Sequence, residues 1–246
     1  MLFRSFVTTQ KPKLSKTSLA ALARTIKPVN WFSDDELMQV PAGSVFVFDV
    51  ETYRNFWYVA FKHLESGKFV AFERSPAGDF NSTKLNWMLW RFCLVGFNSR
   101  NYDLPIISLA LKGATCEQLK EASDFIIKQQ QTVFAFEKQY KVKVERYNHI
   151  DLIEVAPLQG SLKLYAGRLH CERMQDLPFQ EDHILTEEDA QVIRPYCCND
   201  LSNTELLFNE LAPEIKLRCE MSDEYGIDLR SKSDAQVAEA VINSEL

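Results

Sequence analysis

The sequence predicts an α/β fold in which helices flank a mixed central β-sheet. Strand-like runs come first and are followed by alternating helical and strand-like segments, an order typical of α/β domains. The apolar run at 45–48 is unbroken, as in a central strand buried on both faces. With 246 residues, 46% of them hydrophobic, the chain can bury one sizeable core.

The first strands are expected to form an antiparallel meander. The strand that begins at Ser44 runs into Asp49-Val50-Glu51, and two further strands are expected at 53–61 and 68–72. Glu65-Ser66-Gly67 has the composition of a tight turn between them, and tight turns join antiparallel neighbours.

Helices and strands then alternate. Thr186 is expected to cap the last helix of the domain, where the acidic residues 187–189 suit the positive end of the helix dipole. Pro195 is expected to kink or break that helix. The expected elements are a helix at 81–90, a strand at 93–97, helices at 103–112 and 116–128, a strand at 146–155, and helices at 160–169 and 186–211.

The charge divides the chain unevenly. Residues 1–43 are expected to be a basic N-terminal extension, 44–211 the main domain and 212–246 a helical tail. The first 28 residues contribute a net charge of +6, so the rest carries −12 in a chain of net charge −6. Taken alone, an acidic body argues against a nucleic-acid partner, because phosphates attract lysine and arginine.

The cysteine pattern and the hydropathy argue against a secreted, disulfide-bonded protein and against a membrane-spanning one. The six cysteines form no C-x-x-C pair, which favours a reduced, intracellular protein over a secreted, disulfide-bonded one. No run of about 18 apolar residues exists, so no membrane partner is expected.

Acidic residues gather where strands end or helices begin. Asp49 and Glu51 lie two apart on the first strand and therefore share one face. Two like charges on an apolar floor resist ionisation unless a cation offsets them, and hard divalent metals are the usual solution. A surface or structural pair remains the alternative reading.

Two further groups follow the same logic. Asn98-Ser99-Arg100-Asn101-Tyr102-Asp103 leads from an apolar strand into a helix, where Asp103 is either a helix cap or part of a site. On the last helix, Tyr196 and Asp200 are four residues apart and therefore share one face. An ordinary amphipathic helix with a buried tyrosine is the alternative there.

In chain order, the three groups resemble the Exo I, Exo II and Exo III motifs of the DEDD 3′–5′ exonucleases. The segment from Gly96 to Pro105 is similar to the second motif in proofreading domains of family B DNA polymerases. Other subtypes carry a histidine five residues before the last aspartate, where this chain has Pro195, so the chain resembles the tyrosine subtype. The resemblance covers about Ser44 to Leu211 and implies an RNase H-like (exonuclease) fold.

The resemblance also implies a mechanism and a set of roles. Two Mg²⁺ or Mn²⁺ ions are expected on Asp49, Glu51, Asp103 and Asp200, with Asp49 bridging them, to hydrolyse the 3′-terminal phosphodiester. Tyr196 is expected to orient the attacking water, because a phenol is a poor general base at neutral pH. The residues expected to contact the terminal nucleotides of single-stranded DNA are Thr52, Phe97, Asn98 and Tyr102.

The chain is too short to hold a polymerase as well. Its tail from Tyr225 resembles the segment that joins exonuclease and polymerase parts in some phage-type DNA polymerases. We therefore expect residues 44–211 to be the exonuclease domain of a larger polymerase, in the cytoplasm of a bacterial host if phage-encoded. A free-standing exonuclease acting on RNA or DNA, and a non-catalytic nucleic-acid-binding module on the same fold, remain as alternatives.

Overall fold

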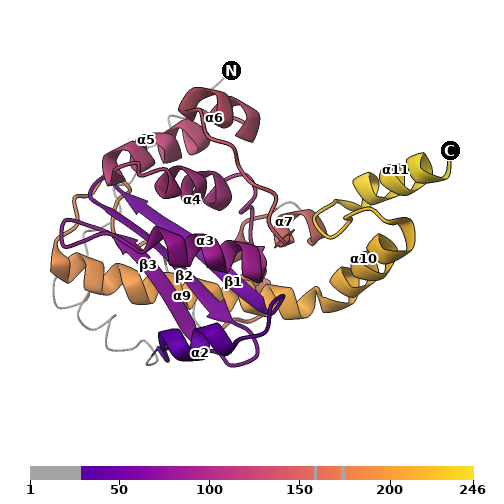
Figure 1. The fold of residues 1–246 in the computed structure, drawn as a ribbon, viewed down its shortest axis with the longest axis horizontal. Coiled ribbons are helices and arrows are strands. Elements are labelled where there is room, and N and C mark those ends of the chain that lie inside the picture. Colours follow the sequence, from indigo (N-terminus) through magenta and orange to yellow (C-terminus); the bar gives the residue numbers. More distant parts are fainter. Residues whose placement is uncertain (1–28, 158–159, 173–175) are drawn as a thin grey trace, which may run out of the picture.

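The computed structural model describes residues 29–157, 160–172 and 176–246. A five-stranded mixed sheet lies at its centre with helices on both faces, so the predicted α/β class is confirmed (Figure 1). The strand order β3-β2-β1-β4-β5 makes β1 the central strand. The strands are β1 (Val45–Tyr53), β2 (Phe56–His63), β3 (Phe69–Arg74), β4 (Cys93–Gly96) and β5 (His149–Asp151).

The expected meander is confirmed. β1, β2 and β3 pair antiparallel, whereas β4 runs parallel to β1 and β5 parallel to β4. Pairing with β2 continues to Tyr53, but pairing with β4 stops at Val47 opposite Val95. The second half of β1 therefore has no strand beside it on the β4 side, and this is where Asp49 and Glu51 lie.

β4 stops at Gly96 because the chain turns back on itself there. A Cβ at this position would lie 2.3 Å from Ser99 Oγ, so only glycine permits the close approach. Ser99 is fully buried, and its hydroxyl shares a 2.8 Å hydrogen bond with His149 Nε2 of β5. The turn after β4 is therefore fastened to the next strand of the sheet.

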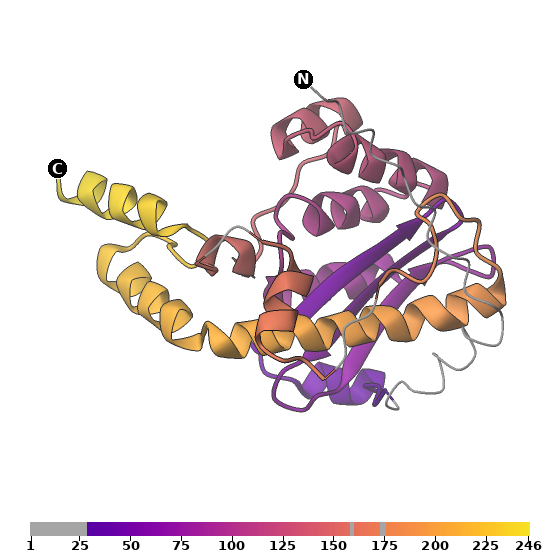
Figure 2. The ribbon, with the colours of Figure 1, turned by 180° about the vertical axis from the view of Figure 1, so that it is seen from behind.

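Helices cover both faces of the sheet. One core contains buried residues of α2 to α6 with Phe46, Phe48 and Val50 of β1, and the other joins Val47 and Tyr53 to α7, α8 and α9. Figures 1 and 2 show α3 and the long α9 on opposite faces. The helices are α2 (Asp34–Gln39), α3 (Ser82–Arg91), α4 (Asp103–Leu111), α5 (Cys116–Ile127), α6 (Val133–Tyr140), α7 (Leu152–Val155), α8 (Leu162–Arg168) and α9 (Glu187–Glu210).

α9 is continuous through Pro195, so of the kink or break expected there, the break does not occur. Thr186 caps it through a reciprocal capping box with Asp189, as its sequence predicts. A proline inside a helix costs about 3 kcal/mol. Burial of Ile193, Tyr196 and Cys197 against the sheet offsets that cost, because apolar surface removed from water stabilises by about 25 cal/mol per Å².

Other elements differ from the sequence-based expectation. The strand expected at 146–155 is limited to β5, because Asp151 caps a short helix, α7, by accepting from Ile153 N. Two further helices were not expected, α2 and α6, and each buries a large apolar side chain, Leu37 and Phe136 respectively. α2 lies within the region expected to be an extension, yet it packs on the core.

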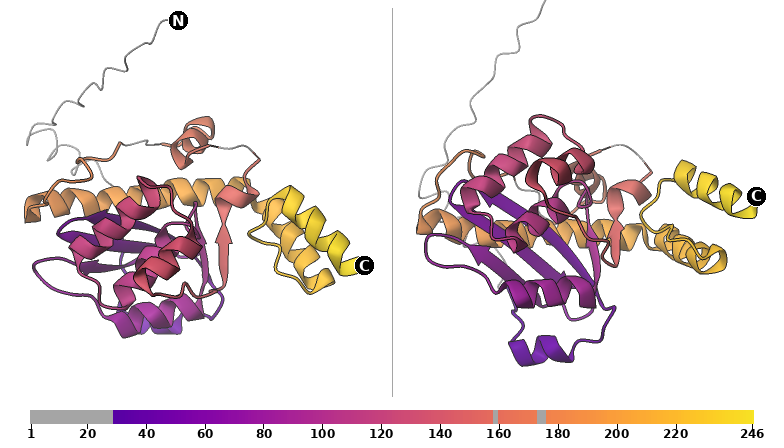
Figure 3. Two further views of the ribbon diagram at one scale, coloured as in Figure 1. Left: turned by 90° about the horizontal axis from the view of Figure 1, so that it is seen from above. Right: turned by 45° about the horizontal axis from the view of Figure 1, so that its top comes forward.

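Beyond α9, two helices extend away from the sheet (Figure 3). They are α10 (Ala212–Tyr225), which ends at Gly226 in the left-handed conformation, and α11 (Asp234–Glu245). Ser231 between them accepts from Asp151 N at 2.9 Å and donates to His149 O at 3.1 Å, which ties the connection to β5. An ion pair of 2.5 Å between Arg218 and Asp234 joins the two helices.

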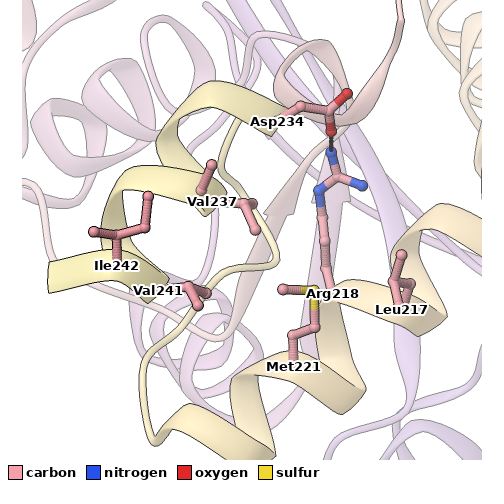
Figure 4. A pocket seen from close by; sticks show the side chains of 8 residues that line it. Leu217, Arg218, Met221, Asp234, Val237, Val241 and Ile242 are labelled. Atoms are coloured by element: carbon pink, nitrogen blue, oxygen red, sulfur yellow. Dashed lines mark hydrogen bonds and ion pairs between the residues drawn. The ribbon is translucent and has the colours of Figure 1, made fainter. Parts of the chain in front are cut away.

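An apolar groove of about 380 Å³ separates these two helices (Figure 4). Val237, Val241 and Ile242 of α11 face Leu217 and Met221 of α10 across it. The groove contains none of the predicted site residues. No helix among the described residues combines the length and the apolar character that crossing a membrane requires.

Candidate active site

Asp49 and Glu51 point toward α9. Because side chains alternate along a strand, the apolar residues Phe46, Phe48 and Val50 enter the core on one face, and the two acids share the opposite face with Val47. Both acids are only partly exposed. β1 thus delivers two carboxylates to one face, in the half of the strand that lacks a neighbour on the β4 side, as the spacing predicts.

Asp103 approaches from the other side of β1. It is the first residue of α4 and is 3% exposed. Its Oδ1 accepts from Val50 N at 3.0 Å. That backbone N–H lies past the end of the pairing with β4, so the carboxylate replaces the missing strand. Asp103 is therefore a buried tertiary contact at the site and not merely a cap for its own helix.

α9 supplies the residues of the third motif. Tyr196 is 4% exposed and forms a hydrogen bond with Asp200, one helical turn away. Cys197 is fully buried beside them, and its Sγ lies 3.7 Å from Asp49 O. α9 packs directly on β1 and β2, which brings the third motif to the first.

The four carboxylates are close enough to perturb one another. Burial raises the pKa of Asp49 to about 8, and the charge of Asp200 adds to the rise. Burial likewise raises the pKa of Glu51, with further contributions from Asp49, Asp200 and Asp103. The pKa of Asp103 is raised by burial and then by Asp49. Burial raises the pKa of Asp200 to about 6, because the hydrogen bond from Tyr196 offsets only part of the burial effect.

This electrostatic arrangement fits a bound cation. Carboxylates that repel one another in a buried place are stabilised in their ionised form by a divalent metal. Among the described residues, one set of three side chains offers ligand atoms within 4.8 Å of one another: Asp49, Glu51 and Cys197. This cluster could hold a metal ion, with Asp103 and Asp200 beside it.

Cys197 is the member that sequence reasoning missed. Burial raises the pKa of its thiol well above the usual range, followed by the charges of Asp49 and Glu51. A neutral thiol is a poor ligand for hard ions, whereas carboxylate oxygens suit Mg²⁺ and Mn²⁺. The only sequence signal for Cys197 as a site residue is its position between Tyr196 and Asp200 on the last helix.

Lys163 of α8 is a positive charge that acts on this group. Its charge lowers the pKa of both Glu51 and Asp200, although burial dominates in each case. It also forms an ion pair of 3.3 Å with Asp176. One lysine cannot offset four carboxylates, so the site retains an excess of negative charge.

Thr52 and Tyr102 lie together at one side of the site. Thr52 Oγ1 is buried near the Tyr102 hydroxyl and forms no well-aligned hydrogen bond. The Tyr102 hydroxyl instead shares a 2.9 Å hydrogen bond with Ser123 Oγ of α5. A buried hydroxyl without a partner is costly, which makes Thr52 a candidate to bind a polar ligand.

Phe97 and Asn98 lie on the turn after β4. The ring of Phe97 packs edge-on against Tyr165 of α8, with 6.1 Å between centroids. Asn98 has a φ of 58°, a left-handed conformation that asparagine tolerates better than most residues. Its backbone N–H donates to Asp151 Oδ1 at 2.6 Å, so the turn is held by a buried carboxylate of β5.

Comparison of the chain with protein-family models, curated proteins and solved structures finds no match in any of the three. All six cysteines lie in the described part of the chain, and none of them forms a disulfide in the structure.

The pKa shifts predict how stability depends on pH. A carboxylate with a raised folded-state pKa stabilises the fold at low pH, and this contribution is lost as pH rises through the folded value. For Asp200 and Asp49 those values are about 6 and about 8. We expect the free energy of unfolding in EDTA to fall by at least about 1 kcal/mol from about pH 5.5 to about pH 8.5.

Urea denaturation at several pH values measures this change. Mn²⁺ at the higher pH should restore stability, because binding to the folded state alone stabilises it. The variant Asp49→Asn should show a smaller pH dependence in EDTA. A stability that increases with pH in EDTA would contradict the arrangement.

Proposed function

We propose that this chain is a metal-dependent 3′–5′ exonuclease of the DEDD superfamily, tyrosine subtype, on an RNase H-like fold. Its reaction is hydrolysis of the last phosphodiester bond at the 3′ end of single-stranded DNA, with release of a nucleoside 5′-monophosphate. One observation carries the proposal: residues from three distant motifs, Asp49 with Glu51, Asp103, and Tyr196 with Asp200, meet in one partly buried, uncompensated acidic site.

Asp49, Glu51, Asp103 and Asp200 would hold two Mg²⁺ or Mn²⁺ ions, in line with the all-oxygen chemistry that such ions prefer. When bound, the ions would supply an activated water and neutralise charge on the leaving oxygen. The Asp103 carboxylate is fixed by Val50 N–H before any ion binds. This pre-organisation reduces the rearrangement that binding requires.

Tyr196 acts as a hydrogen-bond donor. Burial and the nearby carboxylates raise its pKa, so the phenol remains protonated at neutral pH. A protonated hydroxyl next to Asp200 orients a water molecule and does not remove its proton. The orphaned hydroxyl of Thr52 is suited to the sugar or phosphate of the terminal nucleotide.

The direct test is digestion of single-stranded DNA labelled at its 5′ end. With Mg²⁺ or Mn²⁺ the label should pass into a ladder of products shortened from the 3′ end, and EDTA should stop the reaction. Chromatography should identify nucleoside 5′-monophosphates. Absence of shortening with either ion, or removal of the 5′ label, would reject the proposal.

Digestion of a single-stranded RNA of matched sequence distinguishes a proofreading domain of a DNA polymerase from a free-standing nuclease. The carboxylates act on the phosphodiester and do not read the 2′-hydroxyl. Selective digestion of DNA supports a proofreading domain of a DNA polymerase, whereas digestion of RNA at an equal rate supports a free-standing nuclease.

A further inference from the structure

The segment before α9, residues 176–186, crosses from α5 to the turn after β1, and we call it the strap. Figure 2 shows it beside the tips of the strands, in orange. The side chain of Asn55 in the β1–β2 turn fastens its end, donating to Leu185 O at 2.8 Å and accepting from Leu185 N at 2.9 Å. The strap is therefore held in place independently of its charged side chains.

Three cationic side chains meet at the strap residue Asp182. Arg54 of the β1–β2 turn lies 3.6 Å from its carboxylate, and Lys120 and Lys128 of α5 lie at 3.8 and 3.6 Å. We call Arg54, Lys120 and Lys128 the cationic cluster. The Lys120 side chain is 2% exposed, and both Lys120 and Lys128 also pair with Asp124, which lies 3.0 Å from Lys128 Nζ. Three cations and the single carboxylate of Asp124 leave a local positive charge, which favours a further anionic partner.

Asp182 is only weakly bound to the cationic cluster. Its side chain is 58% exposed, and none of its three contacts is short. Ion pairs at such exposed positions contribute about 0–1 kcal/mol each. An incoming backbone phosphodiester carries the same single negative charge on two non-bridging oxygens, so it can replace Asp182 at little cost.

The cationic cluster adjoins the candidate active site. Ser123 lies three residues after Lys120 on α5, so both share one face of the helix, and its hydroxyl bonds Tyr102 next to Thr52. The Tyr53 hydroxyl is buried without a hydrogen-bond partner. Burial raises the pKa of Tyr53, and the charges of Glu51 in the site and Glu181 in the strap both add to the rise. The strap thus borders the place where a 3′ end would enter.

We propose that Arg54, Lys120 and Lys128 form a binding subsite for a backbone phosphate of the single-stranded DNA substrate, which Asp182 occupies in the free protein. This inference rests on the proposed function. It also answers the charge objection, because a body of net charge −12 needs local positive charge to hold a polyanion. The strand lying in the active site would continue across this cluster.

Binding of fluorescein-labelled oligothymidylate of about ten nucleotides tests the subsite. Every variant carries Asp49→Asn as well, so that the oligonucleotide stays intact. Asp182→Asn should tighten binding about threefold or more, because the internal competitor is lost. Arg54→Gln and Lys128→Gln should each weaken it by about threefold to tenfold and reduce the salt slope by about 0.7.

Matched controls distinguish the subsite from general charge effects. Lys143→Gln and Asp223→Asn change exposed charges elsewhere and should leave the affinity within about twofold of the parent. Thymidine 5′-monophosphate should bind all these variants equally, because it is too short to reach the cluster while in the site. If Arg54→Gln weakens the binding of thymidine 5′-monophosphate as much as it weakens the binding of the oligonucleotide, the proposal is overturned.

The two proposals can fail separately. If Asp182→Asn lowers the thermal midpoint and fails to tighten binding, the cluster is only a latch for the strap and this inference is overturned. If wild-type protein digests no DNA but the cluster variants still alter binding as expected, the subsite stands and the proposed exonuclease activity is rejected.

Discussion

Asp49→Ala is expected to reduce 3′ nucleotide release by at least about 10³-fold, corresponding to about 4 kcal/mol of transition-state stabilisation. Asp49 lies in the cluster with Glu51 and Cys197 and also perturbs Asp103, so it is the carboxylate most central to the site. Its loss should also remove Mn²⁺ binding measured by calorimetry. In EDTA at about pH 8 the variant should be more stable than wild type, because a buried repulsive charge is gone.

This opposite effect on activity and stability separates a functional role from a structural one. Asp35→Ala, an exposed acid on α2, serves as the control and should change neither the rate nor the stability in EDTA by a measurable amount. Wild-type nuclease activity in Asp49→Ala would show that the site has been assigned wrongly. Reduced stability together with reduced activity would indicate that Asp49 mainly supports the fold.

Asp151→Ala is expected to lower the free energy of unfolding by about 2–4 kcal/mol. The carboxylate is fully buried and accepts from Asn98 N at 2.6 Å, Arg100 N at 2.9 Å and Ile153 N at 3.4 Å. Alanine leaves these N–H groups without their acceptor. The turn after β4 should loosen, and the nuclease rate should fall because that turn leads into Asp103.

Glu154→Ala is the matched control for this variant. Glu154 is a partly buried acid on α7, three residues away, and its loss should change the free energy of unfolding by less than about 1 kcal/mol. Asp151→Asn keeps one acceptor oxygen and should lie between alanine and wild type. Urea denaturation measures all three, and equal stability of Asp151→Ala and Glu154→Ala would contradict the assigned role.

The sequence was informative about the fold where the signal is local. The apolar run of β1, the turn at Gly67 and the cap at Thr186 each depend on residues a few positions apart, and the structure has each of them. Pro195 does not break α9, because the packing of this helix on the sheet offsets the low helix propensity of proline. β5 is shorter than expected because Asp151 turns the chain into α7.

The candidate site divides in the same way. Periodicity determined that Asp49 shares a face with Glu51, and that Tyr196 shares one with Asp200, because both spacings are fixed by backbone geometry. Cys197, the Asp103–Val50 hydrogen bond and the meeting of Asp182 with Arg54, Lys120 and Lys128 were decided only by the tertiary structure. These contacts join residues between 53 and 148 positions apart, and no local pattern encodes which distant groups burial brings together.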